Sequence, residues 1–215
     1  MDKTMQEMEN GRLAFLNGEF AEAAERYTAA LQTQTLSEAM RIKAITGQLE
    51  SLIELDHLDE AHKLLEQYLQ ESQRPDRRAR KAALLHVKAK YLKQSGDPKA
   101  AVQALREQLT YISSQNERYY MRLTENYLQQ ARVFLYMDEL VEARVYLDLA
   151  TYYMQTDGDD LLKGYYYYYE AKYLLANKQT DEAELFFHSA REQFLRSGAR
   201  WWAAKVDRFL SHLNE

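Results

Sequence analysis

Residues 95–105 read SGDPKAAVQAL, a stretch that ends one helix and begins another. Gly96 suits the left-handed backbone conformation that often follows the last turn of a helix. Asp97 suits the capping position of the next helix, and Pro98 suits its first turn. Ala101 then places a small side chain early in that second helix. This stretch therefore predicts two helices joined by a tight turn.

The same arrangement recurs along the chain, with an alanine followed four residues later by an aromatic residue or leucine. The five pairs are Ala23/Tyr27, Ala61/Leu65, Ala101/Leu105, Ala143/Leu147 and Ala183/Phe187. The alanines are separated by 38, 40, 42 and 40 residues. Mostly small residues also stand twelve positions before them: Gly11, Leu49, Ala89, Ala131 and Ala171. This shared register predicts five repeats of two helices each.

We predict the repeats at residues 3–35, 36–74, 76–115, 116–157 and 159–197, followed by a capping helix at 199–214. The cap has one apolar stripe, formed by Trp202, Val206, Phe209 and Leu213. One helix pair cannot bury its apolar faces alone, whereas stacked pairs share a continuous core. The expected architecture is all-α, a single α-solenoid domain over residues 1–215. In it, Ala101 and Ala143 should lie at tight helix–helix contacts.

The composition favours helices and excludes several classes of site. Seven glycines and two prolines are too few for a loop-rich fold, and the absence of cysteine excludes disulfides and thiolate metal sites. The net charge of −5 provides no general basic field for nucleic acid. With no apolar leader and no apolar span, we expect a cytoplasmic protein without membrane insertion.

The first repeat resembles the tetratricopeptide repeat (TPR) at the signature residues Gly11, Gly18, Phe20, Ala23, Tyr27 and Ala30. The signature tryptophan is replaced in the five repeats by Glu7, Ile45, Leu85, Tyr127 and Tyr167. The period of about 40 residues is similar to that of helical-repeat domains in bacterial regulators of the maltose-activator and Rap type. The resemblance implies a TPR-like solenoid that binds proteins and has almost no chemistry of its own.

The sequence offers no catalytic or metal-binding motif. It contains no phosphate-binding glycine loop, HExxH or GxSxG. The acidic stretch 157–160 lacks the glycine and glutamate of a calcium loop, so we interpret it as a helix cap. The basic run 74–81 is interpreted as a solvated link. We therefore expect no enzyme activity, no cofactor, no metal and no nucleic-acid partner.

In the TPR family, which the chain resembles, the first helix of each pair lines a concave groove. The groove-facing position holds Arg12, Glu50, Lys90, Arg132 and Lys172. Three residues further, Leu135 and Leu175 add apolar surface in the last two repeats. A basic row beside apolar residues suits an acidic or carboxylate-bearing peptide that is partly apolar. We also assign His86 to the partner-binding set.

Aromatic residues suggest further contact points. Fourteen of the 17 tyrosines lie between Tyr111 and Tyr173, and a run of five begins at Tyr165. Five consecutive side chains point all round a helix, and we predict that Tyr165 and Tyr168 contact a ligand. Trp201 lies off the stripe of the cap, so one of the two adjacent indoles should be partly exposed. Trp201 either packs against the preceding helix or contacts a second copy of the chain to form a homodimer.

The sequence therefore predicts a non-enzymatic protein- or peptide-binding module, acting as an adaptor, assembly factor or chaperone. The alternative is a regulatory sensor in which a peptide or protein signal changes the curvature of the solenoid. A more distant alternative is an enzyme, which would require titratable groups converging in a closed pocket.

Overall fold

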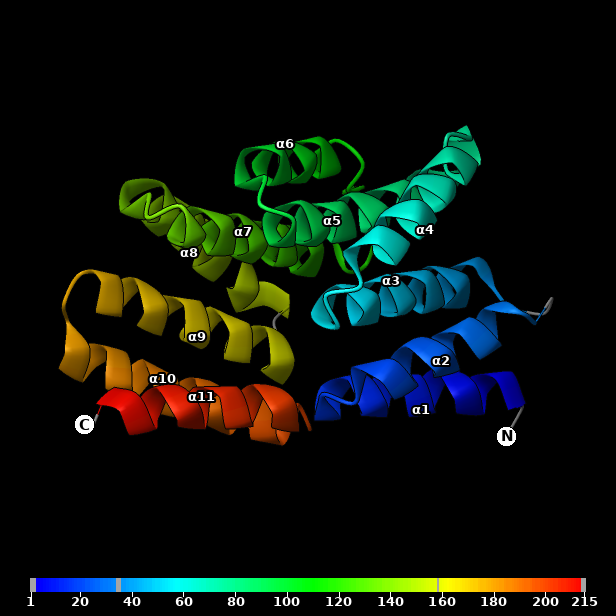
Figure 1. Ribbon diagram of the computed structural model, residues 1–215. Helices are drawn as coiled ribbons and strands as arrows, with labels where there is room; N and C mark the ends of the chain where they lie inside the picture. The colour runs from blue at the N-terminus through cyan, green and yellow to red at the C-terminus, as the bar shows by residue number, and fades with distance from the viewer. Residues whose placement is uncertain (1–2, 34–35, 158, 214–215) are drawn as a thin grey trace. The chain divides into compact units, whose positions relative to one another are not determined.

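A computed structural model describes residues 3–33, 36–157 and 159–213, which are almost entirely helical (Figure 1). Within these ranges the chain forms eleven α-helices and one 3-10 turn, and it contains no strand. The predicted all-α class is confirmed. Residues 34–35, 158 and 214, which fall within the predicted repeats, the acidic stretch and the cap, lie outside the described residues.

The chain divides into two compact units, Met1–Tyr111 and Ile112–Glu215. Unit 1 contains α1 (Lys3–Asn17), α2 (Phe20–Leu31), α3 (Glu38–Glu54), α4 (Leu58–Glu71), the 3-10 turn η1 (Pro75–Arg77), α5 (Arg78–Gln94) and α6 (Pro98–Leu109). Unit 2 contains α7 (Tyr119–Tyr136), α8 (Leu140–Asp157), α9 (Asp160–Ala176), α10 (Thr180–Arg196) and α11 (Arg200–Leu213). The predicted single superhelix concerns the arrangement of the two units, and it stays a prediction.

One turn geometry joins the helices of every hairpin. Its left-handed residues are Gly18, Asp56, Gly96, Asp138, Lys178 and Gly198, with φ between 60° and 92°. In each turn the next residue donates its N–H to a carbonyl five positions earlier, as Asp97 does to Leu92 at 2.8 Å. This hydrogen bond closes the last helical turn of a Schellman motif. The sixth turn shows that α11 follows α10 in the way that α10 follows α9.

The turn predicted from residues 95–105 is confirmed in detail. Gly96 is left-handed with φ 92°. The Asp97 carboxylate accepts the N–H of Ala100 at 3.0 Å, and Pro98 is the first residue of α6. Asp159 caps α9 in the same way by accepting the N–H of Leu162 at 2.8 Å, which supports the capping interpretation of that acidic stretch.

The repeated alanines are buried in all five hairpins. Ala23, Ala61, Ala101, Ala143 and Ala183 are all exposed by 1% or less. The larger residues four positions later, from Tyr27 to Phe187, are also buried. Small side chains let two helix backbones approach, and the larger neighbours fill the remaining space. The predicted register of the hairpins is therefore confirmed within each unit.

Glycines allow an aromatic ring to lie directly against a neighbouring helix in both units. A Cβ atom at Gly47 of α3 would lie 2.4 Å from the ring of Tyr27 on α2. A Cβ atom at Gly164 of α9 would lie 2.6 Å from the ring of Phe194 on α10. The ring thus occupies the space that a side chain would need, which fixes the spacing of the two helices.

The basic run 74–81 is not the solvated link that we expected. Its residues form η1 and the first turn of α5, and Arg80 is only 2% exposed. Arg80 donates two hydrogen bonds to the Glu38 carboxylate at 2.8 and 2.6 Å. Lys81 donates to the Tyr111 hydroxyl at 2.7 Å. These contacts use the positive charge to connect α5 to α3 and to the end of unit 1.

Candidate functional site

Two members of the predicted groove row contact each other within unit 1. Lys90 on α5 donates a hydrogen bond from Nζ to Oε1 of Glu50 on α3 at 2.6 Å. Burial raises the pKa of Tyr27 to about 12, with Glu50 raising it further and Arg12 opposing that rise. The Tyr27 hydroxyl thus lies within electrostatic range of both groups. Glu50 and Lys90 of successive hairpins are therefore neighbours, while the placement of residues 12, 50 and 90 on one groove face stays a prediction.

Both basic residues of this row have carboxylate partners inside unit 1. Arg12 makes a bidentate contact with Glu9, at 3.0 Å from Nε and 2.6 Å from the guanidinium terminus. This hydrogen bond holds the pKa of Glu9 below its usual value. Lys90 is paired with Glu50, and both side chains are about three-quarters buried. Unit 1 therefore presents a largely neutralised row.

Unit 2 is different at the equivalent position of α9. Lys172 is half-buried, and it makes no ion pair with any carboxylate in the described part of the chain. Burial lowers the pKa of Lys172, and the neighbouring charge of Arg132 lowers it further. Its Nζ lies 4.9 Å from the ring centroid of Phe209 on α11. Lys172 is a cation held in apolar surroundings and repelled by a second cation.

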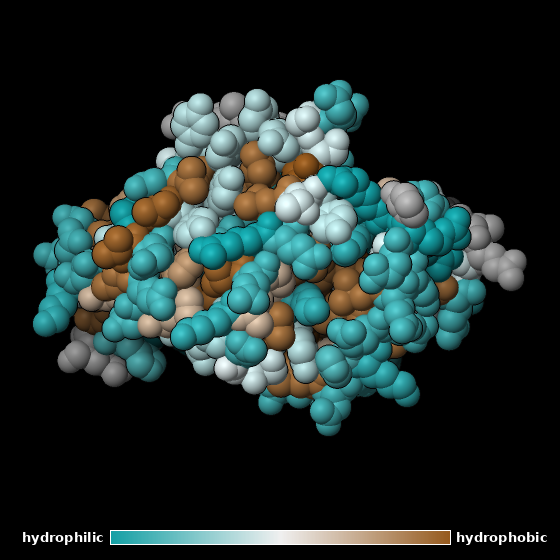
Figure 2. Space-filling view, turned by 90° about the horizontal axis from the view of Figure 1, so that it is seen from above, coloured by the Kyte–Doolittle hydropathy of each residue, from teal (hydrophilic) through white to brown (hydrophobic). Residues whose placement is uncertain are grey.

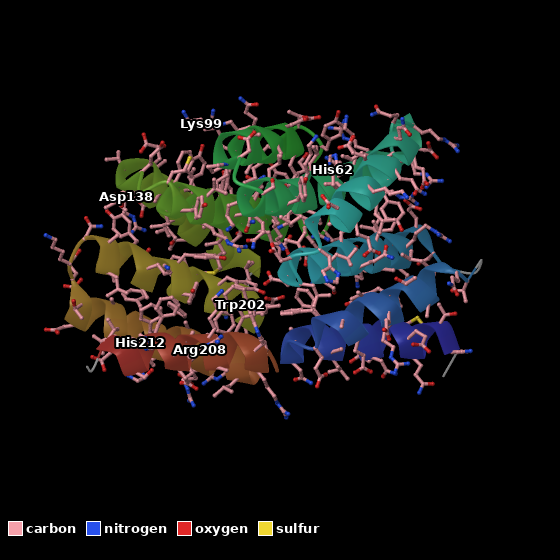
Figure 3. The ribbon with its side chains drawn as sticks, viewed as in Figure 1. His62, Lys99, Asp138, Trp202, Arg208 and His212 are labelled. Carbon is pink, nitrogen blue, oxygen red and sulfur yellow. The ribbon has the colours of Figure 1, made fainter. Side chains whose placement is uncertain are left out.

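Three helices of unit 2 contribute cations to the surroundings of Tyr168 and Phe209. Arg132 of α7 and Arg208 of α11 both oppose the burial-driven rise in the pKa of Tyr168. Lys172 of α9 adds the third charge, and we call Arg132, Lys172 and Arg208 the cation cluster. Arg208 lies along α11 and is exposed, while Trp202 lies between α9 and α11 (Figure 3). Sequence reasoning missed Arg208 because α11 lies outside the five repeats that set the register.

The tyrosine predictions need a correction. Tyr168 is only 4% exposed, with its ring 5.4 Å from Trp202 and 5.9 Å from Phe187 between centroids. Tyr165 is half-buried and packs edge-on against Phe194 and Trp202. These rings pack beneath α11, so Tyr168 is a core residue rather than an exposed ligand contact. The charges of Arg132 and Arg208 act on its hydroxyl.

The remaining candidates lie on the expected helices. Leu135 of α7 and Leu175 of α9 are half-buried and offer apolar surface within unit 2. His86 is half-buried on α5 and belongs to unit 1 with Arg12 and Lys90. Partner binding by these residues stays a prediction.

The two indoles of α11 differ as expected. Trp202 is 8% exposed, whereas Trp201 is half-buried. The Lys205 ammonium lies 4.9 Å from the Trp201 ring centroid and 4.7 Å from that of Trp202. The predicted partial exposure of one indole is confirmed, while a homodimer contact through Trp201 stays a prediction.

Unit 1 also has an open hollow of about 430 Å³ bordered by α2, α3 and the first turn of α4. Gln48 forms part of it and accepts a hydrogen bond from the Tyr68 hydroxyl at 3.0 Å. Gln48 in turn donates to the Thr28 hydroxyl at 2.7 Å. The register did not predict this hollow, because it depends on the separation of neighbouring hairpins rather than on the hairpin itself.

The described residues contain no group of three or more histidine, aspartate or glutamate side chains placed to hold a metal ion. None of the described helices has the length and apolar character needed to span a membrane.

No protein-family model matches the chain, and no curated protein matches it significantly. Among solved structures, the chain is similar to the TPR2AB-domain:pHSP90 complex of yeast Sti1, at 14% identity and a TM-score of 0.42. That match covers 99% of this chain and 98% of the other. A likeness of this degree says nothing about what this chain binds. The hairpins and buried positions of the described residues show an all-α fold of repeated helix pairs.

Proposed function

We propose that the chain is a non-enzymatic protein-binding module whose unit 2 holds a carboxylate of a partner peptide. The observation that supports this proposal is Lys172, a half-buried cation that has no carboxylate partner in the described ranges and is repelled by Arg132. A bound carboxylate would offset the repulsion between these two charges and accept hydrogen bonds from Lys172. Such charge-assisted hydrogen bonds strengthen where water is excluded.

The surroundings favour a peptide over a free ion. Leu135 and Leu175 lie three residues beyond Arg132 and Lys172, one helical turn along the same face. Phe209 adds a half-buried ring beneath the Lys172 ammonium. An acidic segment with apolar side chains would contact both kinds of surface. The role is then that of an adaptor, assembly factor or chaperone.

The test is a random peptide library selected on the whole chain, followed by fluorescence anisotropy with the selected acidic peptides. The double variant Arg132→Glu with Lys172→Glu should weaken binding at least about a hundredfold, because each lost charge-assisted hydrogen bond is worth roughly 1.5–3 kcal/mol. Circular dichroism should show unchanged helicity.

A matched control makes the same charge change elsewhere. Lys99 and Arg106 are exposed on α6, and Lys99→Glu with Arg106→Glu should leave the affinity within about twofold. Equal affinities of the two double variants would overturn the proposal, since binding would then follow net charge alone.

A further inference from the structure

Apolar side chains reach the surface in several patches on the face that Figure 2 shows. Among the described residues, the two most exposed of the large apolar side chains belong to α8 of unit 2. Val141 is 76% exposed, Val145 51% and Tyr152 69%, with half-buried Leu149 between the last two. Residues spaced by four, four and three positions lie along one face of a helix. We call these four residues the α8 stripe.

The hairpin fold does not require this stripe. The opposite face of α8 is already buried through Ala143, Leu147 and Ala150. At the register of the stripe, the other hairpins carry mainly polar residues: Asp59, Lys63, Gln67 and Gln70 on α4, and Lys99, Gln103, Glu107 and Thr110 on α6. On α10 the equivalents are Asp181, Leu185, Ser189 and Glu192. The stripe is thus a property of α8 and not of the repeat.

Acidic residues border the stripe on both sides. Glu142 and Asp148 are exposed next to Val145 on the helical wheel, one on each flank. Arg144 pairs with Asp148 at 2.8 Å, but it also donates to Glu170 of α9 at 2.6 Å, so one guanidinium is shared between two carboxylates. The edges of the stripe therefore remain acidic and favour a basic partner.

The C-terminal end of the stripe continues into a group of tyrosines. The Tyr152 ring lies edge-on to Tyr153 with centroids 5.0 Å apart. Tyr153 in turn stacks on Tyr120 of α7 at 6.0 Å, and Tyr120 is 45% exposed. Rigid aromatic rings with polar hydroxyl tips are typical of protein contact surfaces.

The geometry favours a helix as the occupant. The stripe spans twelve residues, and its ends are about 16 Å apart at 1.5 Å per residue, which matches three turns of a partner helix. The described part of the chain has no strand edge to pair with an extended segment. A helix brings its own backbone hydrogen bonds and needs only a side-chain surface.

We propose that the α8 stripe docks an amphipathic helix of a partner protein that has Lys or Arg on both sides of its apolar face. A second copy of α8 would bring Glu142 and Asp148 against the same acidic residues, and an anionic lipid surface would meet the same repulsion. This site is separate from the cation cluster, which uses α7, α9 and α11, and it does not depend on the function proposed above.

The test uses two fluorescent helical peptides of about 15 residues, both with leucine along one face, one flanked by lysine and the other by glutamate. Anisotropy should show that the whole chain binds the lysine-flanked peptide at least tenfold more tightly. Replacing three stripe residues by those of α6 (Val141→Lys, Val145→Gln and Tyr152→Thr) should reduce that affinity at least tenfold. The substituted side chains are more than half exposed, so the fold should persist.

Two further variants sharpen the result. Leu185→Gln removes the 68% exposed leucine of α10 at the register of Val145, and it should leave the affinity unchanged. Glu142→Lys with Asp148→Lys should reverse the preference toward the glutamate-flanked peptide. Equal binding of both peptides, or full binding by the triple stripe variant, would overturn the proposal. It would also fail if sedimentation showed that the stripe instead holds two copies of this chain together.

Discussion

Unit 1 and unit 2 use the same hairpin but treat the basic residues of its first helix differently. In unit 1, Arg12 is paired with Glu9 and Lys90 with Glu50. In unit 2, Lys172 has no paired carboxylate among the described residues and is repelled by Arg132. The repeat therefore fixes where a basic residue stands, while its neighbours decide whether its charge remains available to a partner.

The largest expected effect compares how the two units pack an aromatic ring against a glycine. Gly164→Ala should destabilise unit 2 by about 1–3 kcal/mol, because the new Cβ would meet the fully buried ring of Phe194 at 2.6 Å. Gly47→Ala should cost less, since it meets the outer end of Tyr27, which is 7% exposed and has more room to move. Urea unfolding of both variants measures the difference.

If Gly164→Ala were instead stabilising, by the ~1 kcal/mol that alanine gains over glycine inside a helix, the close contact of α9 with α10 would be wrong. Equal losses in the two variants would show that the ring of Tyr27 is held as firmly as that of Phe194. Either result would contradict the expected difference between the two units in how an aromatic ring packs against a glycine.

The second prediction concerns the left-handed turn residues, which are glycine in some hairpins and not in others. Gly96→Ala in unit 1 should lower stability by about 1 kcal/mol, since a Cβ there meets nothing within 4 Å and only the backbone conformation is penalised. Lys178→Gly in unit 2 should raise stability by a similar amount, because Lys178 has φ 63°. Thermal melts that moved both variants in one direction would contradict this account.

The third and smallest effect tests the charge difference itself. Glu50→Gln breaks the Glu50–Lys90 ion pair and should cost less than about 1 kcal/mol at neutral pH. Lys172→Gln breaks no ion pair with any residue that the structure describes, and it removes a charge that burial and Arg132 disfavour. It should therefore leave the stability at pH 7 unchanged or slightly higher. Urea midpoints of the two variants provide the comparison.

The same lysine predicts a pH dependence of defined sign. Because the pKa of Lys172 is lowered in the folded protein, the unfolded chain binds the proton more tightly. Stability from this group should therefore rise as the pH increases from the lowered value toward the ordinary lysine value of about 10.4. The difference in stability between wild type and Lys172→Gln should shrink over that range. If wild type instead lost stability relative to Lys172→Gln as the pH increased, Lys172 would have to have a carboxylate partner.

Much of the fold could be predicted because it depends on local features. Turn residues, caps and buried alanines recur at fixed intervals, and each constrains the backbone within a few residues of itself. The Glu50–Lys90 ion pair could also be predicted from the sequence, because the two residues occupy the same register in successive repeats. Opposite charges at matching positions of neighbouring hairpins predict an ion pair.

Other parts of the site depend on distant segments. Arg80 is buried against Glu38, 42 residues earlier, and no local pattern distinguishes it from the exposed basic residues beside it. Tyr168 is a core residue because α11 covers its face of α9. Five consecutive tyrosines point in all directions, so the sequence alone could not show which side α11 would cover.

Both tryptophans of the chain lie side by side in α11, and Trp202 contacts Tyr165 and Tyr168 of α9. Tryptophan fluorescence, excited at wavelengths that tyrosine does not absorb, will therefore report only on unit 2. The far-UV circular dichroism of the helices reports on both units. Comparing the two signals during one urea titration separates the unfolding of the units without any label. Energy transfer from Tyr165 and Tyr168 to Trp202 adds a third signal, which disappears when α11 leaves the surface of α9.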